Sequence, residues 1–360
     1  MSRACVIEPG STIGILGGGQ LGRMTAMAAA RLGYRCAILA PDDDCIAAAV
    51  SDSWIRADYG DRAALARFAE AVDVVTIEFE NVPADALDFL AGRVPTRPAS
   101  AILEVTQDRL VEKRFIERVG VPVAPFRPVE TAGDLDRARE ELGDNGILKT
   151  RRLGYDGKGQ VRIEGMASDA AVAAIGGSPA ILEAFMPFAH ELSVITARNP
   201  QGDVASFPPV LNIHRDQILR QTIAPGGFAP EIADRAVELA ESIARGLELE
   251  GLIAVEMFLM DNGDLAVNEL APRPHNSGHW TIDACQTSQF EQLVRAICGL
   301  KPGGTAPLHR AVMDNLIGED LLQWPQLLDE PDAFLHIYGK ASIRAGRKMG
   351  HVTRLSPLGT

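Results

Sequence analysis

The segment Ala254–Leu270 places the tightest constraint on the fold of this chain. Its residues 261–264, DNGD, lie between two apolar runs, and Asn-Gly between such runs is the strongest short-range signal for a β-hairpin. If Asn262-Gly263 is a two-residue loop, Glu256 lies directly opposite Glu269, with Cβ atoms about 4.5–5.5 Å apart on one face. The neighbours on both faces are apolar. The sequence therefore predicts two carboxylates that face each other in a largely buried hairpin.

Two carboxylates in such a place need something to offset their repulsion. At about 5 Å and an effective dielectric constant near 20, that repulsion is roughly 3 kcal/mol before any cost of desolvation. A shared proton, a buried arginine or lysine, or a divalent cation would serve. With Asn268 beside them, Glu256 and Glu269 form an all-oxygen set suited to Mg²⁺, or Mn²⁺, that holds phosphates. The alternatives are a register error of one residue, or a structural arginine, for which Arg273 is close by.

A second motif is a basic loop that follows an expected strand at Gly146–Thr150. Residues 149–160 contain four basic residues, one acidic residue and three glycines, a local charge of +3 in a chain of net charge −13. Glycine is tolerated where a backbone must move or come close to a ligand. A mobile cationic flap over a polyphosphate explains both the charge and the glycines. A plain basic surface loop explains only the charge.

The N-terminal hundred residues alternate strands and helices, which indicates a parallel sheet covered by helices. Residues 17–22, GGGQLG, match G-x-G-x-x-G between a strand and a helix, and Asp42 ends the second strand. This pattern is the dinucleotide fingerprint, but a tight strand–helix turn without a dinucleotide is the alternative. A charged amphipathic helix is expected at Thr106–Val119, and strands return after residue 304.

Composition excludes several classes of protein. The chain has 360 residues with 35 Lys plus Arg against 48 Asp plus Glu, which argues against binding to nucleic acid or an anionic membrane. The longest stretch without a charged residue, Pro9–Gly22, is too short to span a bilayer, and no signal peptide fits. The cysteines lack zinc-type spacing, which indicates reduced thiols in a cytoplasmic protein.

Several motifs together resemble the ATP-grasp superfamily: Lys149, GYDGKGQ at 154–160, EAFM at 183–186, and Glu256 with Asn268-Glu269. Within that superfamily, four longer motifs closely resemble the N5-carboxyaminoimidazole ribonucleotide synthetases: residues 17–23, EFENVP at 78–83, NELAPRPHNSGH at 268–279, and GRKMGHV at 346–352. The resemblance covers almost the whole chain in the expected order. Its longer motifs make it far more specific than a single glycine pattern.

The resemblance implies an ATP-grasp fold of mixed α/β and α+β class. It implies a Rossmann-like parallel-sheet domain at 1–105, an ATP-grasp domain at 106–300 with a flap subdomain at about 120–187, and a small β-rich domain at 301–360. The implied enzyme is a cytoplasmic homodimer that acts in purine biosynthesis. It joins bicarbonate to 5-aminoimidazole ribonucleotide at the expense of ATP, with Mg²⁺ and through carboxyphosphate, and protein groups mainly position and stabilise charge.

The resemblance also implies roles for individual residues around ATP. Glu256 and Glu269 would hold the metal, Arg109, Lys149 and His214 would contact phosphates, and Glu191 would bind the ribose. Glu183, Phe185 and Met186 would frame the adenine. The remaining ATP contacts would come from Ala184, Asn268 and the loop residues Gly154, Gly157, Gly159 and Gln160. On the residues alone, Arg109 could be a helix-surface charge, Glu191 an edge carboxylate and His214 a surface histidine.

For the second substrate, Tyr155, Asp156 and Lys158 resemble the residues that contact the aminoimidazole. Family members often have Arg where Lys158 stands, so a bidentate contact there is not expected. The wall for bicarbonate and substrate would be Arg273, His275, Asn276 and Ser277, with His275 the candidate for proton handling. Lys340 and Arg347, in a C-terminal stretch without acidic residues, match the phosphate clamp, although a basic solvated hairpin is the alternative. The glycine loop would serve this same ribonucleotide, with Gln20, Leu21 and Glu78 nearby.

Three other functions compete with the carboxylating ligase. A nicotinamide-dependent oxidoreductase would use the glycine loop and Asp42, but it leaves the carboxylate pair and the basic loop without a role. A regulatory module that no longer catalyses would be indicated by a degraded metal pair or flap, and both are intact here. Within the superfamily, a biotin-carboxylase-like or formate-using ligase is the nearest rival. Tyr155-Asp156 and the basic C-terminus favour the aminoimidazole substrate.

Overall fold

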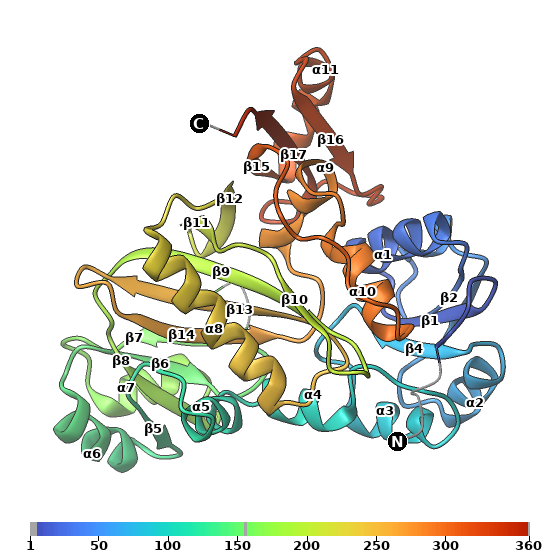
Figure 1. The fold of residues 1–360 in the computed structure, drawn as a ribbon. Helices are drawn as coiled ribbons and strands as arrows, with labels where there is room; N and C mark the ends of the chain where they lie inside the picture. Colours follow the sequence, from blue (N-terminus) through green and yellow to red (C-terminus); the bar gives the residue numbers. More distant parts are fainter. Residues whose placement is uncertain (1–5, 155–156, 359–360) are drawn as a thin grey trace.

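The computed structural model describes residues 6–154 and 157–358, and its first domain contains the expected parallel sheet. The strand order is β3-β2-β1-β4, with bounds β1 (Thr12–Leu16), β2 (Arg35–Ala40), β3 (Ser53–Arg56) and β4 (Val74–Ile77). Helices α2 (Arg62–Glu70) and α3 (Ala84–Ala91) pack on one face of the sheet, and α1 (Gln20–Arg31) and α10 (Gln289–Ile297) on the other. The sheet, blue in Figure 1, is thus sandwiched between two helical layers, of which α10 is orange.

A second, antiparallel sheet has the order β5-β8-β6-β7 and lies at the lower left of Figure 1. Its elements are β5 (Phe126–Val129), α6 (Ala132–Leu142), β6 (Gly146–Thr150), β7 (Gln160–Arg162), α7 (Ser168–Ala174) and β8 (Ala180–Ala184). Leu148 and Leu182 pack under α6 and α7. Because successive strand residues point to opposite faces, the adjacent Lys149 and Glu183 point away from these helices.

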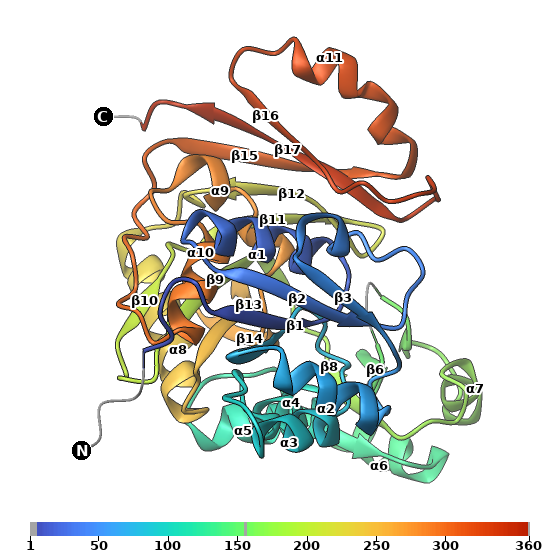
Figure 2. The same ribbon diagram turned by 90° about the vertical axis from the view of Figure 1, so that its right-hand side faces the viewer.

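The third sheet has nine strands, which pair antiparallel, in the order β14-β13-β9-β11-β12-β15-β17-β16 with β10 paired to β9. Their bounds are β9 (Phe188–Arg198), β10 (Val204–Ser206), β11 (Val210–Arg215), β12 (Ile218–Ala224), β13 (Gly251–Met260), β14 (Leu265–Ala271), β15 (Arg310–Ile317), β16 (Ala333–Ile337) and β17 (Lys348–Ser356). The long helix α8 (Pro230–Gly246) covers one face. Through the β12–β15 pair the sheet continues into the C-terminal strands, at the top of Figure 2.

The remaining helices are short or lie between these layers. They are α4 (Ser100–Thr106), α5 (Arg109–Arg118), α9 (Thr281–Ala284) and α11 (Trp324–Leu328), with 3-10 turns η1 (Ala48–Val50), η2 (Asn276–Gly278) and η3 (Gly318–Gln323). The single helix expected at Thr106–Val119 is wrong in its start. Asp108 breaks it, because its side chain accepts hydrogen bonds from the Leu110 and Val111 amides and so caps α5.

The hairpin of β13 and β14 pairs Glu256 with Glu269, as predicted, although the predicted two-residue loop is wrong. Met260 and Asp264 are joined by a backbone hydrogen bond of 2.9 Å around a three-residue loop, which shifts the register by one. A bulge next to Glu256 then shifts it back, since Met257 pairs with Val267 and Asn268 is left as the extra residue. Two compensating shifts therefore bring the carboxylates opposite each other.

Within the part of the chain that the structure describes, no helix is long and apolar enough to cross a membrane. Cys36, Cys45, Cys285 and Cys298 are free thiols, as the sequence predicts. Cys5 lies outside the described residues.

Candidate active site

A buried cluster of opposite charges lies where the second sheet meets β14. Lys149 Nζ donates to Glu183 Oε2 at 3.0 Å, and Lys113 Nζ from α5 lies 3.4 Å from the same oxygen. Lys113 also donates to the backbone oxygen of Asn268 at 3.0 Å. Burial alone would raise the pKa of Glu183, but the two lysines lower it to about 2. Glu183 is therefore a buried carboxylate that stays charged.

Next to this cluster is a small pocket with an apolar, aromatic lining. Its walls bring together the expected residues Lys149, Glu183, Ala184, Phe185 and Met186, and also include Ala124, Ile147, Phe188 and Phe258. Phe188 and Phe258 stack with ring centroids 4.5 Å apart. The chain thus forms an apolar slot that ends on a buried lysine and carboxylate, a setting that suits a flat heteroaromatic ring.

Arginine and histidine side chains contact the carboxylate pair. Glu269 Oε2 lies 3.1 Å from Arg109, and Glu256 Oε1 lies 2.9 Å from His275 Nε2. Although burial alone would raise the pKa of Glu256, His275, His214 and Arg273 lower it to about 2. The expected structural arginine, Arg273, instead pairs with Glu80. A buried arginine thus offsets part of the repulsion, so the pair can exist without a metal between the acids.

A metal held here would depend on few protein ligands. Among residues 6–154 and 157–358, no group of three or more His, Cys, Asp or Glu side chains is arranged to hold a metal ion. Mg²⁺ typically takes one or two carboxylates and completes its shell with water and substrate phosphates. The donor set of Glu256 and Glu269 fits that pattern.

His214 and Glu191 lie beside the carboxylate pair on neighbouring strands. His214 Nδ1 is 2.9 Å from Glu191 Oε2. Burial lowers the pKa of His214, but Glu191 and Glu256 outweigh it, so the net shift is upward. Neither residue is an isolated surface charge: the sheet face brings them together with the carboxylate pair.

The basic loop at residues 149–160 contacts two other elements. Arg109 reaches the Gly154 carbonyl oxygen at 3.5 Å, and Gln160 Nε2 donates to Gln217 Oε1, in the turn between β11 and β12, at 2.9 Å. Lys158 is exposed in this loop with Gly159, and Gly157 is half-buried. Tyr155 and Asp156, both predicted to contact the substrate, lie outside the described residues.

The N-terminal glycine loop is occupied by a side chain of the protein. Glu78 accepts hydrogen bonds from the Gly19 and Gly22 amides at 2.7 and 3.2 Å. A Cβ atom on Gly17 would lie 2.4 Å from Glu78 Cγ, so the loop needs glycine to admit this carboxylate. Burial raises the pKa of Glu78. The amides that a dinucleotide phosphate would require are thus already used, which argues against the oxidoreductase alternative.

The predicted clamp residues of the C-terminus reach this N-terminal loop region. Arg347 lies 3.0 Å from Asp44, whose carboxylate also accepts from the Ala341 amide at 3.3 Å. Lys340 donates to the Lys348 carbonyl oxygen at 2.6 Å, and burial, helped by Arg347, lowers its pKa to about 8. Gln20 and Leu21 begin helix α1 on the same loop. Asp44 and Arg347, 303 positions apart in sequence, are therefore neighbours.

The predicted wall at residues 273–277 is only partly open to a ligand. Asn276 Nδ2 is buried and has no hydrogen-bond partner in the described residues. Ser277 is 0% exposed, and its hydroxyl lies 2.8 Å from His275 Nδ1. Ser277 therefore stands behind His275 and not on the wall where it was expected.

Comparison with known proteins shows the same domain order. The ATP-grasp domain matches residues 114–290, the ribonucleotide synthetase preATP-grasp domain residues 11–107, and the phosphoribosylaminoimidazole carboxylase C-terminal domain residues 311–357. An N5-carboxyaminoimidazole ribonucleotide synthase from Brucella melitensis is 50% identical over 98% of both chains. The chain belongs to the N5-carboxyaminoimidazole ribonucleotide synthase family. The predicted family and ATP-grasp fold are thereby confirmed, and the chain is an ATP-dependent ligase.

Solved structures of the N5-carboxyaminoimidazole ribonucleotide synthase family have the same fold. An N5-carboxyaminoimidazole synthetase from Staphylococcus aureus, complexed with ADP, is 38% identical and has a TM-score of 0.93, covering 98% of this chain and 95% of its own. A synthase from Aspergillus clavatus, in complex with ADP and 5-aminoimidazole ribonucleotide, is 31% identical with a TM-score of 0.89, covering 96% and 94%.

Several residues of this synthase-family site were missed by reasoning from sequence. The buried face of α5 carries Glu112, which accepts the Leu270 amide at 2.8 Å, beside Lys113. Burial raises the pKa of Glu112 to about 8. A signal existed: both residues precede the buried Ile116 by three or four positions, the spacing that places side chains on one helix face. Asp44, which pairs with Arg347, and Glu80, which pairs with Arg273, showed no such sequence signal.

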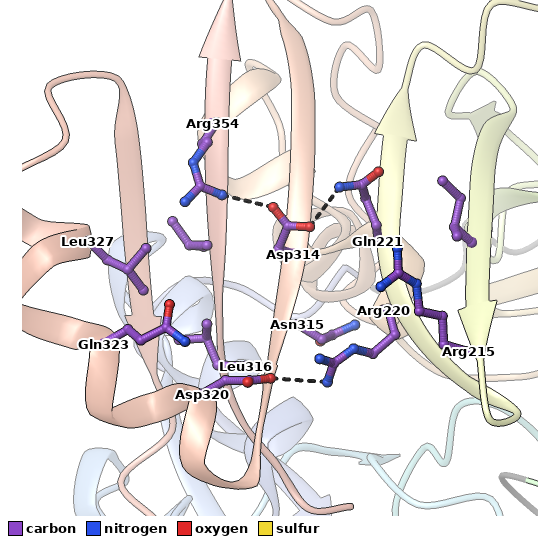
Figure 3. Close-up of a pocket in the computed structure, with 12 residues that line it drawn as sticks. Arg215, Arg220, Gln221, Asp314, Asn315, Leu316, Asp320, Gln323, Leu327 and Arg354 are labelled. Carbon is purple, nitrogen blue, oxygen red and sulfur yellow. Dashed lines mark hydrogen bonds and ion pairs between the residues drawn. The ribbon is translucent and has the colours of Figure 1, made fainter.

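A separate cavity of about 310 Å³ lies between β12, β15 and α11 (Figure 3). Several of its polar groups pair with one another: Arg354 lies 2.8 Å from Asp314, which also accepts from Gln221, and Arg220 lies 3.0 Å from Asp320. Gln221 precedes Thr222 in β12, and Asp314 follows Met313 in β15. The side chains of Gln221 and Asp314 therefore point to the sheet face opposite that of Thr222 and Met313. The cavity is thus separate from the synthase-family site.

Proposed function

We propose that this chain carries out the reaction of its family, the ATP-dependent carboxylation of 5-aminoimidazole ribonucleotide by bicarbonate to N5-carboxyaminoimidazole ribonucleotide, in purine biosynthesis. The observation that carries the proposal is one continuous arrangement. The aromatic slot, the Lys149–Glu183 cluster and the Glu256–Glu269 pair lead from an adenine position to a phosphate position. The glycine loop with Lys340 and Arg347 supplies a separate site for a ribonucleotide.

The adenine occupies the slot of Ala184, Phe185 and Met186, with Phe188 and Phe258 as its aromatic floor. Glu183, held charged by two lysines, accepts from the exocyclic amine, and Glu191 binds the ribose. Lys149, Arg109 and His214 contact the phosphates, with the Gly154–Gln160 loop folded over them. Arg109, which pairs with Glu269 in this structure, already lies where it can bind an anion.

Glu256 and Glu269, with Asn268 beside them, would hold Mg²⁺ or Mn²⁺. Bound there, the metal would neutralise charge on the β- and γ-phosphates of ATP. The protein's own contribution is to present two carboxylates at one register position of the hairpin, contacted by His275 and Arg109.

The reaction requires mainly that the protein positions the reactants. A bicarbonate oxygen attacks the γ-phosphorus, ADP leaves, and carboxyphosphate forms. The exocyclic amine then attacks the carboxyl carbon, either of carboxyphosphate itself or of the CO₂ released from it. Phosphate leaves, and the amine gives up a proton. Arg273 and Asn276 Nδ2, which has no hydrogen-bond partner in the described residues, hold the bicarbonate, and His275 is the candidate for proton handling. Tyr155, Asp156 and Lys158 orient the aminoimidazole, and Lys340 and Arg347 bind its phosphate.

The test is phosphate release from MgATP and bicarbonate, measured with and without 5-aminoimidazole ribonucleotide. We expect strong stimulation by the nucleotide and formation of the carboxylated product from ¹⁴C-bicarbonate. Equal phosphate release in both conditions would contradict the proposal. Action as a homodimer and a place in the cytoplasm stay predictions, as do the domain boundaries at residues 105 and 300.

A further inference from the structure

A line of buried hydrogen bonds runs across three strands to the ring of His275. Thr222 Oγ1 on β12 donates to Asn212 Oδ1 on β11 at 3.1 Å, and Asn212 Nδ2 donates to Ser193 Oγ on β9 at 2.9 Å. Ser193 Oγ lies 2.7 Å from Ser277 Oγ, which lies 2.8 Å from His275 Nδ1. Thr222, Asn212, Ser193 and Ser277 are between 0 and 5% exposed. We call these four residues the Thr222–Ser277 chain.

The direction of this chain follows from its two ends. At one end, the Glu256 carboxylate only accepts, so His275 Nε2, 2.9 Å away, carries the hydrogen and donates it. His275 Nδ1 accepts from the Ser277 backbone amide, which can only donate, at 3.4 Å, so Ser277 Oγ, 2.8 Å from the same nitrogen, donates to it as well. At the far end, Asn212 donates to Ser193. Ser193 therefore has its own hydroxyl hydrogen free to donate to Ser277, and each group donates toward Glu256.

The backbone of His275 is fixed independently. Gln289, at the start of α10 and 0% exposed, accepts from the His275 amide at 2.9 Å and donates to the His275 carbonyl oxygen at 2.8 Å. With the backbone clamped by Gln289, one ring nitrogen held by Ser277 and the other by Glu256, the imidazole has no free rotation. Gln289 and Ser277 are both 0% exposed.

We propose that Ser277, Ser193 and Asn212 are positioning residues: their one-way chain of hydrogen bonds fixes the orientation of the His275 ring, with Nε2 aimed at Glu256. The proposal rests on the proposed function, in which Glu256 and His275 take part. Hydrogen-bond partners of this kind fix ring orientation, and their loss typically lowers activity 10- to 100-fold. Ser277 thereby gains a role that differs from the substrate contact predicted for it.

The first test reads the tautomer and does not need activity. In protein labelled with ¹⁵N at the histidine side chains, long-range ¹H–¹⁵N spectra distinguish Nε2–H from Nδ1–H rings, and the His275→Gln variant assigns the signal. We expect His275 as a single Nε2–H ring in the wild type and a broadened or second His275 signal in Ser277→Ala, since the ring is then held mainly at Nε2. A wild-type ring that carries its hydrogen on Nδ1 would overturn the proposal, whether or not the chain carboxylates its substrate.

The second test is kinetic and uses a matched control. Ser277→Ala and Ser193→Ala, on different elements, should each lower kcat about tenfold while the KM for ATP changes less than twofold. Thr353→Val removes a fully buried hydroxyl that has no hydrogen-bond partner in the described residues, so kcat and the His275 signal should stay as in the wild type. Both serine variants at wild-type kcat with an unchanged tautomer would overturn the proposal.

Discussion

At the scale of single residues, Glu183 is the counter-charge to two buried lysines on the ATP side of the site. It is 3% exposed and faces both Lys113 and Lys149. Glu183→Gln would leave two buried cations without a counter-charge, and removing one partner of a buried ion pair costs about 3–5 kcal/mol. We expect a loss of that size in the free energy of unfolding, measured with urea. Adding Lys113→Met should recover part of it, and Glu241→Gln, whose partner is the exposed Arg245, should cost under about 1 kcal/mol.

Glu269 belongs to the same scale but affects catalysis more than stability. Its side chain is 41% exposed, so Glu269→Gln should leave the far-UV circular dichroism spectrum unchanged. Loss of the negative charge opposite Glu256 should lower kcat at least about a hundredfold and raise the Mg²⁺ concentration needed for half-maximal rate. Asp264→Asn, an exposed acid on the same hairpin, serves as control. Turnover above a tenth of the wild-type rate would remove Glu269 from the metal site.

These residues also show what a sequence can reveal. Lys149 and Glu183 lie next to strand ends, and Glu256 and Glu269 lie in the two strands of one hairpin, where local pattern predicts their neighbours. Lys113 was missed despite its spacing to Ile116, because a charged residue on an amphipathic helix is expected to face water. Only the position of α5 against Asn268 and Glu183 turns it inward.

At the scale of elements, the β13–β14 hairpin shows a correct pairing reached from an incorrect turn. Asn-Gly predicted a bend at residues 262–263, and the bend is there. A local pattern, however, does not distinguish a two-residue loop from a three-residue loop followed by a bulge. The bulge at Asn268 depends on the neighbouring chain: Lys113 binds the Asn268 carbonyl oxygen and Glu112 the Leu270 amide. Register was thus settled by tertiary contacts that no hairpin pattern contains.

Helix α5 permits an element-scale prediction, because its cap also anchors the basic loop. Asp108 caps the helix and binds Arg151 at 3.0 and 2.7 Å, whereas Asp61 only caps α2. Loss of a cap costs about 1 kcal/mol. Asp61→Ala should show that value in urea unfolding, and Asp108→Ala should exceed it by about 1 kcal/mol or more, since Arg151 loses a buried partner. Equal losses in the two variants would contradict a role for Asp108 beyond capping.

At the scale of the whole molecule, the C-terminal strands join two distant parts of the chain. They extend the large sheet through β15 and reach the N-terminal domain through Asp44 and Arg347. A column of histidine rings reinforces this junction. The ring centroids of His279 and His351 are 4.8 Å apart, and those of His336 and His351 are 4.5 Å apart. His336 in turn pairs with Asp283. The sequence predicted the separate regions but gave no sign of this packing between them.

This ring column makes stability depend on pH. Burial, and then neighbouring histidines, hold the pKa values of His279 and His351 well below 6.5, so these rings stay neutral when folded but take up protons when unfolded. Stability is therefore lost as pH falls below about 6.5. We expect a lower urea midpoint at pH 5.5 than at pH 7.5, and a smaller drop in His351→Gln. Glu112, with its raised pKa, opposes this trend equally in both proteins, so the difference between them isolates the histidines. Equal drops would show that His351 does not carry the effect.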